Sequence, residues 1–377
     1  MNSPQRLAQA HDAIAQAWPD ASDLVMDEGV CKRTDGLFDK VRGVVSDVEW
    51  PLYAPLVDGI NRLKRERNAI ILAHNYMTPE IFHCVGDITG DSLKLAQVAA
   101  DAEEDVIVQA GVHFMAETAK ILSPEKTVLI PDLKAGCSLA ESITGADVRA
   151  IRRACPDYPI VTYVNTSAEV KAESDICCTS SNAIAVVEAI AKQRGTDTVI
   201  MIPDQFLARN VASQTDIRVL TWNGACEVHE QFTRAEIEQL RAEHPEAMII
   251  THPECPPEVL HVSDFSGSTG AMSAFVSEQR PAKAILITEC SMSDNVAAVN
   301  PGTQFIRPCN LCPHMKRITL QGIYEALRDM QHVVHVDPET AQRARQSLRA
   351  MLELPTGDHP PSFDTSREEK SVEFVPV

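Results

Sequence analysis

The sequence repeats one pattern of apolar strands, polar turns and helical stretches three times, and this repetition constrains the fold more than any other feature. Three apolar runs rich in β-branched residues predict buried parallel strands. These runs are 68–76 (NAIILAHNY), 158–166 (YPIVTYVNT) and 246–254 (EAMIITHPE). About ninety residues separate one run from the next. A chain with this period folds as three similar units.

Each unit continues in the same order after its first strand. A hydroxyl-rich turn precedes a helical stretch, and the three turns are Gly90-Asp91-Ser92, Thr179-Ser180-Ser181-Asn182 and Gly267-Ser268-Thr269-Gly270. A second strand, another helical stretch and a last strand running into a cysteine complete the unit. The closing cysteines are Cys137, Cys226 and Cys312, which lie 89 and 86 residues apart. Alternating strands and helices indicate βαβ units and parallel sheets, whose ligand groups gather beyond the carboxyl ends of the strands.

We therefore expect an α/β protein of three homologous three-layer α/β/α domains, each with a parallel sheet of about four strands, arranged with pseudo-threefold symmetry around a central site. Asp337-Pro338 predicts the cap and first turn of a C-terminal helix, and the Pro-, Ser- and charge-rich end of the chain predicts disorder. The expected parts are an N-terminal extension (1–54), three repeats (55–140, 141–228 and 229–316), C-terminal helices (317–354) and a disordered tail (355–377).

The overall charge excludes several classes of partner. The 377 residues include 34 Lys and Arg against 53 Asp and Glu, a formal net charge of −19. This charge repels a phosphate backbone, and the sequence contains no basic stripe, so we expect no nucleic-acid partner. The apolar runs are too short to span a bilayer or are interrupted by a charged residue such as Glu188. The start of the sequence lacks the basic segment followed by an apolar run that is typical of a signal peptide. We expect a cytoplasmic protein with no membrane partner.

The eleven cysteines favour free thiols or metal ligands over disulfides in a reducing compartment. Zinc usually takes paired cysteine spacings, which one cysteine per repeat does not supply. Three thiolates on an iron–sulfur cluster would leave one iron open as a Lewis acid. A redox-active Cys309–Cys312 pair stays an alternative. The remaining cysteines are interpreted as buried, inert side chains: Cys31, Cys84, Cys155, Cys177, Cys178, Cys255 and Cys290.

Ordered motifs between about residues 68 and 316 carry a specific family resemblance. They include LAHNY, GDSL, PDLKAGCSLA, YVNTSAEVKA, WNGACEVHE, THPEC, GSTGAM and CNLCPHMK. In these motifs the chain resembles the quinolinate synthases, iron–sulfur enzymes of de novo NAD biosynthesis. The resemblance implies three similar α/β/α domains around a central pocket. Some relatives carry a longer CxxCxxC motif, but Ile306 stands where its first cysteine would be, which puts in doubt any redox regulation attributed to that motif.

The resemblance also implies a reaction and a cofactor. The reaction is a transferase-type condensation of iminoaspartate with dihydroxyacetone phosphate, giving quinolinate, phosphate and two waters. One [4Fe–4S] cluster per chain would be held by Cys137, Cys226 and Cys312, the cysteine before Pro313, and its open iron would act as a Lewis acid. Pathway logic adds an aspartate oxidase or dehydrogenase as the source of iminoaspartate.

Particular residues are expected to carry this chemistry. The carboxylates and phosphate of the substrates are expected to meet His74, Ser92, Tyr163, Asn165, Ser180 and Thr269. Ser and Thr at helix starts can instead be simple caps. Proton transfer is assigned to Tyr76, His252 and Glu254, for which a core tyrosine and a solvated His and Glu are the alternatives.

Two rival functions stay open at this stage. A hydro-lyase of another pathway would use the same open iron. An electron carrier or sensor would need a fourth ligand, for which Cys290 or Cys309 is available.

Overall fold

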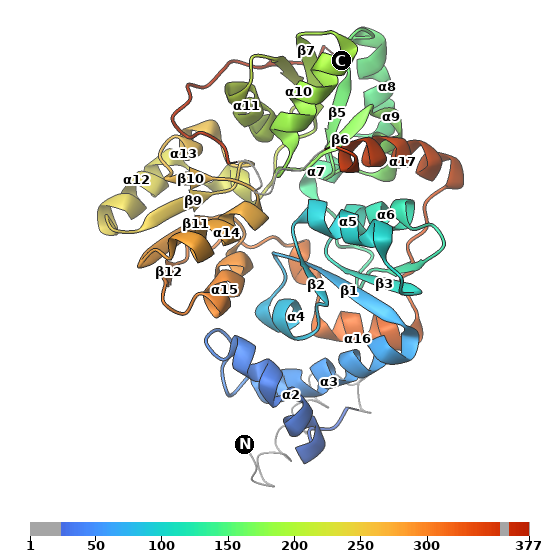
Figure 1. The fold of residues 1–377 in the computed structure, drawn as a ribbon, viewed down its shortest axis with the longest axis vertical. Helices are drawn as coiled ribbons and strands as arrows, with labels where there is room; N and C mark the ends of the chain where they lie inside the picture. The colour runs from blue at the N-terminus through green and yellow to red at the C-terminus, as the bar shows by residue number, and fades with distance from the viewer. Residues whose placement is uncertain (1–23, 355–361, 377) are drawn as a thin grey trace.

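The computed structural model describes residues 24–354 and 362–376, and Figure 1 shows three α/β units around a common centre. Each unit contains a four-stranded parallel sheet in which its first strand lies between its second and third. The first sheet consists of β2 (Ile88–Gly90), β1 (Ala69–His74), β3 (Val106–Ala110) and β4 (Thr127–Leu129), in this spatial order. This architecture confirms the predicted three-domain α/β class.

The other two sheets have the same strand order. The second comprises β6 (Ile176–Cys178), β5 (Ile160–Tyr163), β7 (Thr198–Ile202), β8 (Arg218–Thr221) and an added strand, β13 (Glu373–Phe374). The third comprises β10 (Phe265–Ser266), β9 (Met248–Thr251), β11 (Lys283–Ile287) and β12 (Gln304–Ile306). The strand register repeats as well, because the last residues of β1, β5 and β9 pair with those of β2, β6 and β10. The turns after these strands therefore begin at equivalent positions in the three sheets.

Helices cover the faces of the sheets. The first unit has α4 (Pro79–Cys84), α5 (Ser92–Asp101), α6 (His113–Leu122) and α7 (Ser138–Glu141). The second has α8 (Gly145–Ala154), α9 (Ala168–Glu173), α10 (Ala183–Arg194), α11 (Gln205–Gln214) and the 3₁₀ turn η2 (His229–Gln231). The third has α12 (Arg234–Glu243), α13 (Pro257–Leu260), α14 (Thr269–Gln279), α15 (Cys290–Val299) and the 3₁₀ turn η3 (Met315–Arg317).

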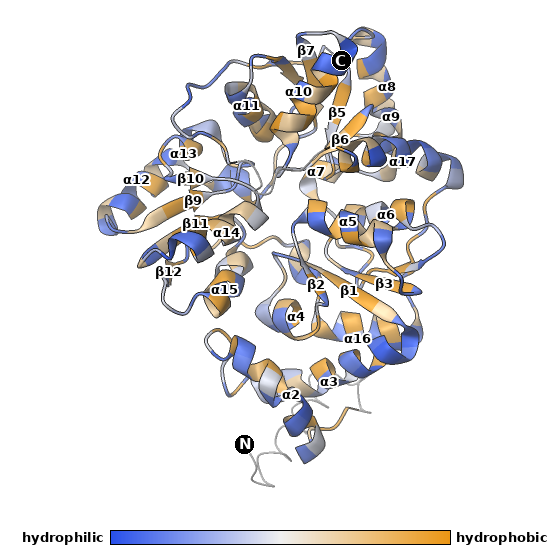
Figure 2. Cartoon of the chain, viewed as in Figure 1, coloured by the Kyte–Doolittle hydropathy of each residue, from blue (hydrophilic) through white to orange (hydrophobic). Residues whose placement is uncertain are grey.

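The strands are buried because helices lie on both of their faces. The side chains of β3 (VIVQA) and β7 (TVIMI) are all buried, which explains why their sequences are mostly apolar rather than alternating. Figure 2 shows apolar colouring along the strands and hydrophilic colouring on the outer helices. Because the strands are buried, the polar residues that follow them lie at the edge of each sheet.

The flanking segments pack onto this framework. Helices α2 (Glu28–Val41) and α3 (Trp50–Arg67) lie under the first sheet, where the rings of Phe38 and Trp50 stack with centroids 4.9 Å apart. Helix α16 (Leu320–Asp329) packs on α3, and α17 (Pro338–Leu352) packs on α9. The Asp337 carboxylate accepts a hydrogen bond from the Thr340 amide at 2.9 Å, as its predicted capping role requires. Within residues 24–354 and 362–376, every helix is too short or too polar for a membrane span.

The structure corrects the prediction of a disordered tail over 355–377 for the part that it describes. The Phe363 side chain is buried, and its amide donates to the carbonyl of Ser266 at 2.9 Å. Further along, β13 pairs with β8 of the second unit. The tail therefore joins the third unit to the second, and its few apolar residues suffice because existing strands supply the backbone partners. Residues 355–361 and 377 lie outside the described residues.

Candidate active site

The carboxyl ends of the strands from all three units open onto one cavity. The cavity is lined by every residue to which the sequence analysis assigned a role: His74, Tyr76, Ser92, Cys137, Tyr163, Asn165, Ser180, Cys226, His252, Glu254, Thr269 and Cys312. Residues far apart in the sequence meet here because each unit presents the same strand ends to the common centre.

The three cysteines reach the cavity through equivalent local structures. Each follows the last strand of a unit and precedes a short helical turn, α7, η2 or η3. Each sulfur faces the backbone N–H groups of the residues two and three positions further on. For Cys312, the Met315 amide lies 3.5 Å from Sγ. Such N–H groups favour a thiolate over a thiol.

Burial opposes ionisation of these thiols. It raises the pKa of Cys137 to about 12, and it also raises the pKa values of Cys226 and Cys312. A bound metal centre would reverse this balance, because coordination deprotonates a thiol outright. Three soft sulfur donors on one cavity, each supported by backbone N–H groups, fit an iron–sulfur cluster by their chemistry.

A buried hydrogen-bond network lies beside Cys226. The Tyr76 hydroxyl is 2.6 Å from Thr288 Oγ1 and 3.4 Å from His229 Nε2, and Thr288 Oγ1 is 2.9 Å from the same nitrogen. His229 Nδ1 lies 3.2 Å from Cys226 Sγ and 2.7 Å from Glu254 Oε2. Burial and the nearby Glu254 carboxylate raise the pKa of Tyr76 well above 10, so the phenol keeps its proton at neutral pH.

His229 and Thr288 were not among the residues predicted from the sequence. His229 stands in the motif WNGACEVHE, three residues after Cys226, so the spacing from a predicted ligand could have identified it. Thr288 follows the apolar strand β11 and carries no comparable signal in the sequence.

Glu254 lies among polar side chains of the cavity. It accepts hydrogen bonds from the Tyr163 hydroxyl at 2.5 Å and from Asn165 Nδ2 at 3.4 Å. Burial alone would favour the neutral acid, but the adjacent His229 and the hydrogen bond from Tyr163 outweigh it and lower the pKa of Glu254. Glu254 is therefore a buried carboxylate at neutral pH.

Strand β9 ends at Thr251, so His252 and Glu254 belong to the following turn, and both line the cavity. His252 stacks on His229, with ring centroids 4.7 Å apart. Burial lowers the pKa of His252 to about 3, so its imidazole is neutral at pH 7.

The hydroxyl-rich turns also meet at this cavity. Ser92 and Thr269 are the first residues of α5 and α14, and Asp91 holds the turns together. Its carboxylate accepts from Ser181 Oγ at 2.6 Å and from Ser268 Oγ at 3.3 Å. Ser92, Ser180 and Thr269 thus line a region near three helix N-termini, whose N–H groups and dipoles attract anions.

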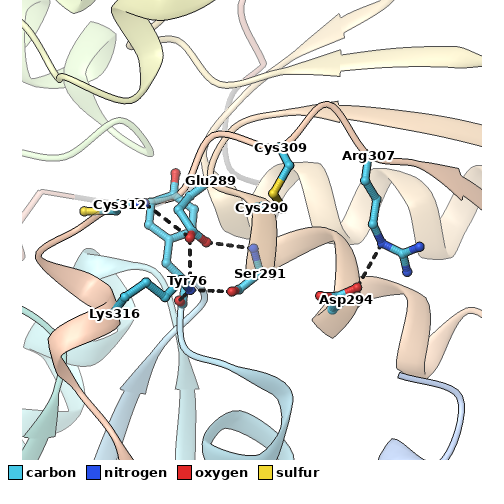
Figure 3. The surroundings of a disulfide bond; sticks show 9 residues. All are labelled: Tyr76, Glu289, Cys290, Ser291, Asp294, Arg307, Cys309, Cys312 and Lys316. Carbon is cyan, nitrogen blue, oxygen red and sulfur yellow. Dashed lines mark hydrogen bonds and ion pairs between the residues drawn. A yellow bond between two sulfur atoms is a disulfide. The ribbon is translucent and has the colours of Figure 1, made fainter. Parts of the chain in front are cut away.

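A disulfide lies next to this site and corrects the interpretation of two cysteines. Cys290, expected to be inert, is bonded to Cys309, with Cα atoms 4.9 Å apart. Figure 3 shows the bridge beside Glu289 and Lys316; Lys316 Nζ lies 3.0 Å from Glu289 Oε1 and donates to the Tyr76 carbonyl at 3.1 Å. The alternative Cys309–Cys312 pair is therefore wrong for this structure. Neither Cys290 nor Cys309 is free to be the fourth ligand of an electron carrier.

Comparisons with known proteins agree with this geometry. The model of the family described as "Quinolinate synthetase A protein" matches residues 58–353. The chain is 59% identical to the quinolinate synthase of Caulobacter vibrioides over 345 residues, which cover 91% of this chain and 94% of the relative. It is 61% identical to quinolinate synthase 2 of Mesorhizobium japonicum over 316 residues, 84% of this chain and 96% of the relative. The chain therefore belongs to the quinolinate synthase family.

Proposed function

We propose that this protein condenses iminoaspartate with dihydroxyacetone phosphate to form quinolinate, with release of phosphate and two waters. The observation that carries the proposal is the composition of a single cavity. Three partly buried cysteines, a tyrosine–histidine–glutamate network and three hydroxyl-rich helix starts line it. Two anionic substrates, proton transfers and dehydration require such groups together.

We also propose that Cys137, Cys226 and Cys312 hold one [4Fe–4S] cluster per chain. When bound, the cluster would supply a Lewis-acidic iron that has no cysteine ligand. The backbone N–H groups facing each sulfur support this assignment, because hydrogen bonds to ligand sulfurs stabilise their negative charge.

The substrates' carboxylates and phosphate would bind where the helices α5, α10 and α14 begin. Ser92, Ser180 and Thr269 supply hydroxyl donors there, beside the neutral His74. Among residues 24–354 and 362–376, Asn165 Oδ1 has no hydrogen-bond partner, although it is buried at the cavity. A substrate N–H or O–H group would satisfy it.

Proton transfer would use Glu254 and the hydrogen-bond network around Tyr76. Glu254, ionised and buried, is suited to accept a proton as the carbon–carbon bond forms. Tyr76 is suited to donate one to a departing hydroxyl group, and Thr288 and His229 can return a proton to it through their hydrogen bonds. His252 restricts the ring of His229 by stacking.

The test is a direct assay of the anaerobically purified protein. L-Aspartate and an aspartate oxidase, the proposed functional partner, would supply iminoaspartate in the presence of dihydroxyacetone phosphate, and quinolinate would be quantified by chromatography. Glu254→Gln should lower the rate by about a hundredfold or more while leaving the cluster absorbance intact. Glu258→Gln, at an exposed position on α13, is the matched control. Absence of quinolinate from the wild type, or an unchanged rate in Glu254→Gln, would overturn the proposal.

A further inference from the structure

The chain turns at an equivalent position after the first strand of every unit. The turns follow His74, Tyr163 and His252, and the residue in the middle of each is Tyr76, Asn165 or Glu254. Two turns are closed by equivalent backbone bonds, since Met77 N donates to His74 O at 2.9 Å and Cys255 N donates to His252 O at 3.0 Å, whereas in the second unit the Thr166 hydroxyl donates to Tyr163 O at 2.9 Å. Each middle residue lines the cavity.

Two backbone carbonyl groups flank each middle residue, one on either side. In every turn, one buried side chain donates to both of them. Asn295 Nδ2 donates to Asn75 O at 3.0 Å and to Met77 O at 2.7 Å. Asn210 Nδ2 donates to Pro253 O at 2.8 Å and to Cys255 O at 2.9 Å.

The turn of the second unit uses a different donor for the same task. Lys171 Nζ donates to Val164 O at 2.8 Å and also to Thr166 O. The Lys171 side chain is fully buried, and Asn210 and Asn295 are each 3% exposed. Water is therefore a poor substitute donor, and the loss of one of these side chains would leave two carbonyls without partners.

The positions of the donors follow the repeat. Asn210 and Asn295 are the sixth residues of α11 and α15. Asn210 belongs to the second unit but binds the turn of the third, and Asn295 belongs to the third unit but binds the turn of the first. The sixth residue of α6 is Thr118, whose hydroxyl donates within its own helix to Phe114 O. A hydroxyl has one hydrogen and cannot serve two carbonyls, whereas an amide or ammonium group can.

We propose that Asn210, Asn295 and Lys171 are positioning residues that form three equivalent carbonyl clamps. Each clamp fixes the backbone on both sides of Glu254, Tyr76 or Asn165 and thereby aims that side chain into the cavity. Two of the clamps cross from one unit to the next, so the active-site geometry depends on how the units dock. The catalytic importance of the clamps rests on the proposed function; their effect on the turns does not.

The main test replaces Asn210 with leucine, which has a similar volume and no donor. Because a small displacement of a catalytic group is costly, Asn210→Leu should lower kcat for quinolinate formation by about tenfold to a hundredfold. KM for dihydroxyacetone phosphate should change by less than about threefold, because the helix starts that would bind it are untouched. Asn295→Leu should have a similar effect through Tyr76, and it serves as the second variant if Asn210→Leu does not fold.

Asn61→Leu is the matched control, because Asn61 Nδ2 donates to Cys84 O at 3.0 Å away from the cavity. It also removes an amide donor, but kcat should remain within about twofold of the wild type. A kcat for Asn210→Leu equal to that of Asn61→Leu would overturn the proposal.

Hydrogen–deuterium exchange of the metal-free protein supplies a readout that does not depend on turnover. Asn210→Leu should accelerate exchange in a peptide covering 252–256, whereas Asn61→Leu should not. Unchanged exchange in that peptide would contradict the clamp. If the wild type makes no quinolinate, the proposed function fails, and the exchange experiment still decides whether the clamp exists.

Discussion

Replacing Thr288 with valine tests the network around Tyr76 directly. Thr288 is fully buried, and its hydroxyl contacts both Tyr76 and His229. Valine has nearly the same shape but no hydroxyl, so the change removes two hydrogen bonds without leaving a large cavity. The Tyr76 hydroxyl and His229 Nε2 are 3.4 Å apart, which makes the bond between them a weak replacement.

The size of the effect follows from these contacts. A buried polar group that loses its partner costs about 1–3 kcal/mol. If Thr288 passes protons between His229 and Tyr76, its replacement should reduce the stabilisation of the transition state by about 1.4–2.8 kcal/mol. Such a loss corresponds to a tenfold to hundredfold fall in kcat.

The assay measures quinolinate formation at saturating dihydroxyacetone phosphate, together with the thermal midpoint of each variant. Thr288→Ser keeps the hydroxyl and should restore kcat to within about threefold of the wild type. A Thr288→Val variant with the kcat of the wild type would refute the relay. Equal losses in the valine and serine variants would show that packing, rather than the hydroxyl, explains the effect.

Three further predictions concern stability. Burial lowers the pKa of His74 from 6.5 to about 4, so between these pH values only the unfolded chain binds this proton. About 3 kcal/mol of stability, complete above pH 6.5, should therefore be lost as the pH falls towards 4. Urea titrations of the metal-free His74→Gln variant should lack this pH-dependent component. Phe363→Ala should lower the free energy of unfolding in urea by about 3 kcal/mol, whereas Phe374→Ala, at a side chain 53% exposed, should change it by less than about 0.5 kcal/mol. Cys290→Ser removes a bridge to Cys309 that spans 19 residues, so without reductant it should lower the free energy of unfolding by about 3 kcal/mol. With reductant, the difference between the variant and the wild type should vanish. Equal unfolding midpoints of the variant and the wild type in both conditions would contradict this prediction.

The three-fold repeat in the sequence predicted most of the fold, because each repeat forms the same arrangement of strands and helices. The apolar runs identified the first strand of each sheet, and the common register placed Cys137, Cys226 and Cys312 at equivalent positions. Parallel strands in register bring their carboxyl ends to one edge, so the sequence order sufficed to collect the site residues.

Features that depend on how separate segments pack together were not predictable in the same way. The approach of Cys290 to Cys309 depends on how the loop before Cys312 folds back onto α15. Asn210 looks like an ordinary polar residue in a helix, and its role becomes visible only when the third unit packs against the second. The tail carrying Phe363 has a composition typical of disorder, but strands already formed elsewhere provide its partners.

The central claim is that one cysteine from each unit holds a common iron–sulfur cluster. Iron and acid-labile sulfide should therefore be measured in anaerobically purified wild type, in Cys137→Ser, Cys226→Ser and Cys312→Ser, and in Cys31→Ser, which alters a buried thiol on α2. We predict about four iron and four sulfide per chain for the wild type and Cys31→Ser, and a large loss of both in each of the other three variants. Bound zinc without sulfide in the wild type, or full iron and sulfide in any of those three variants, would contradict the account.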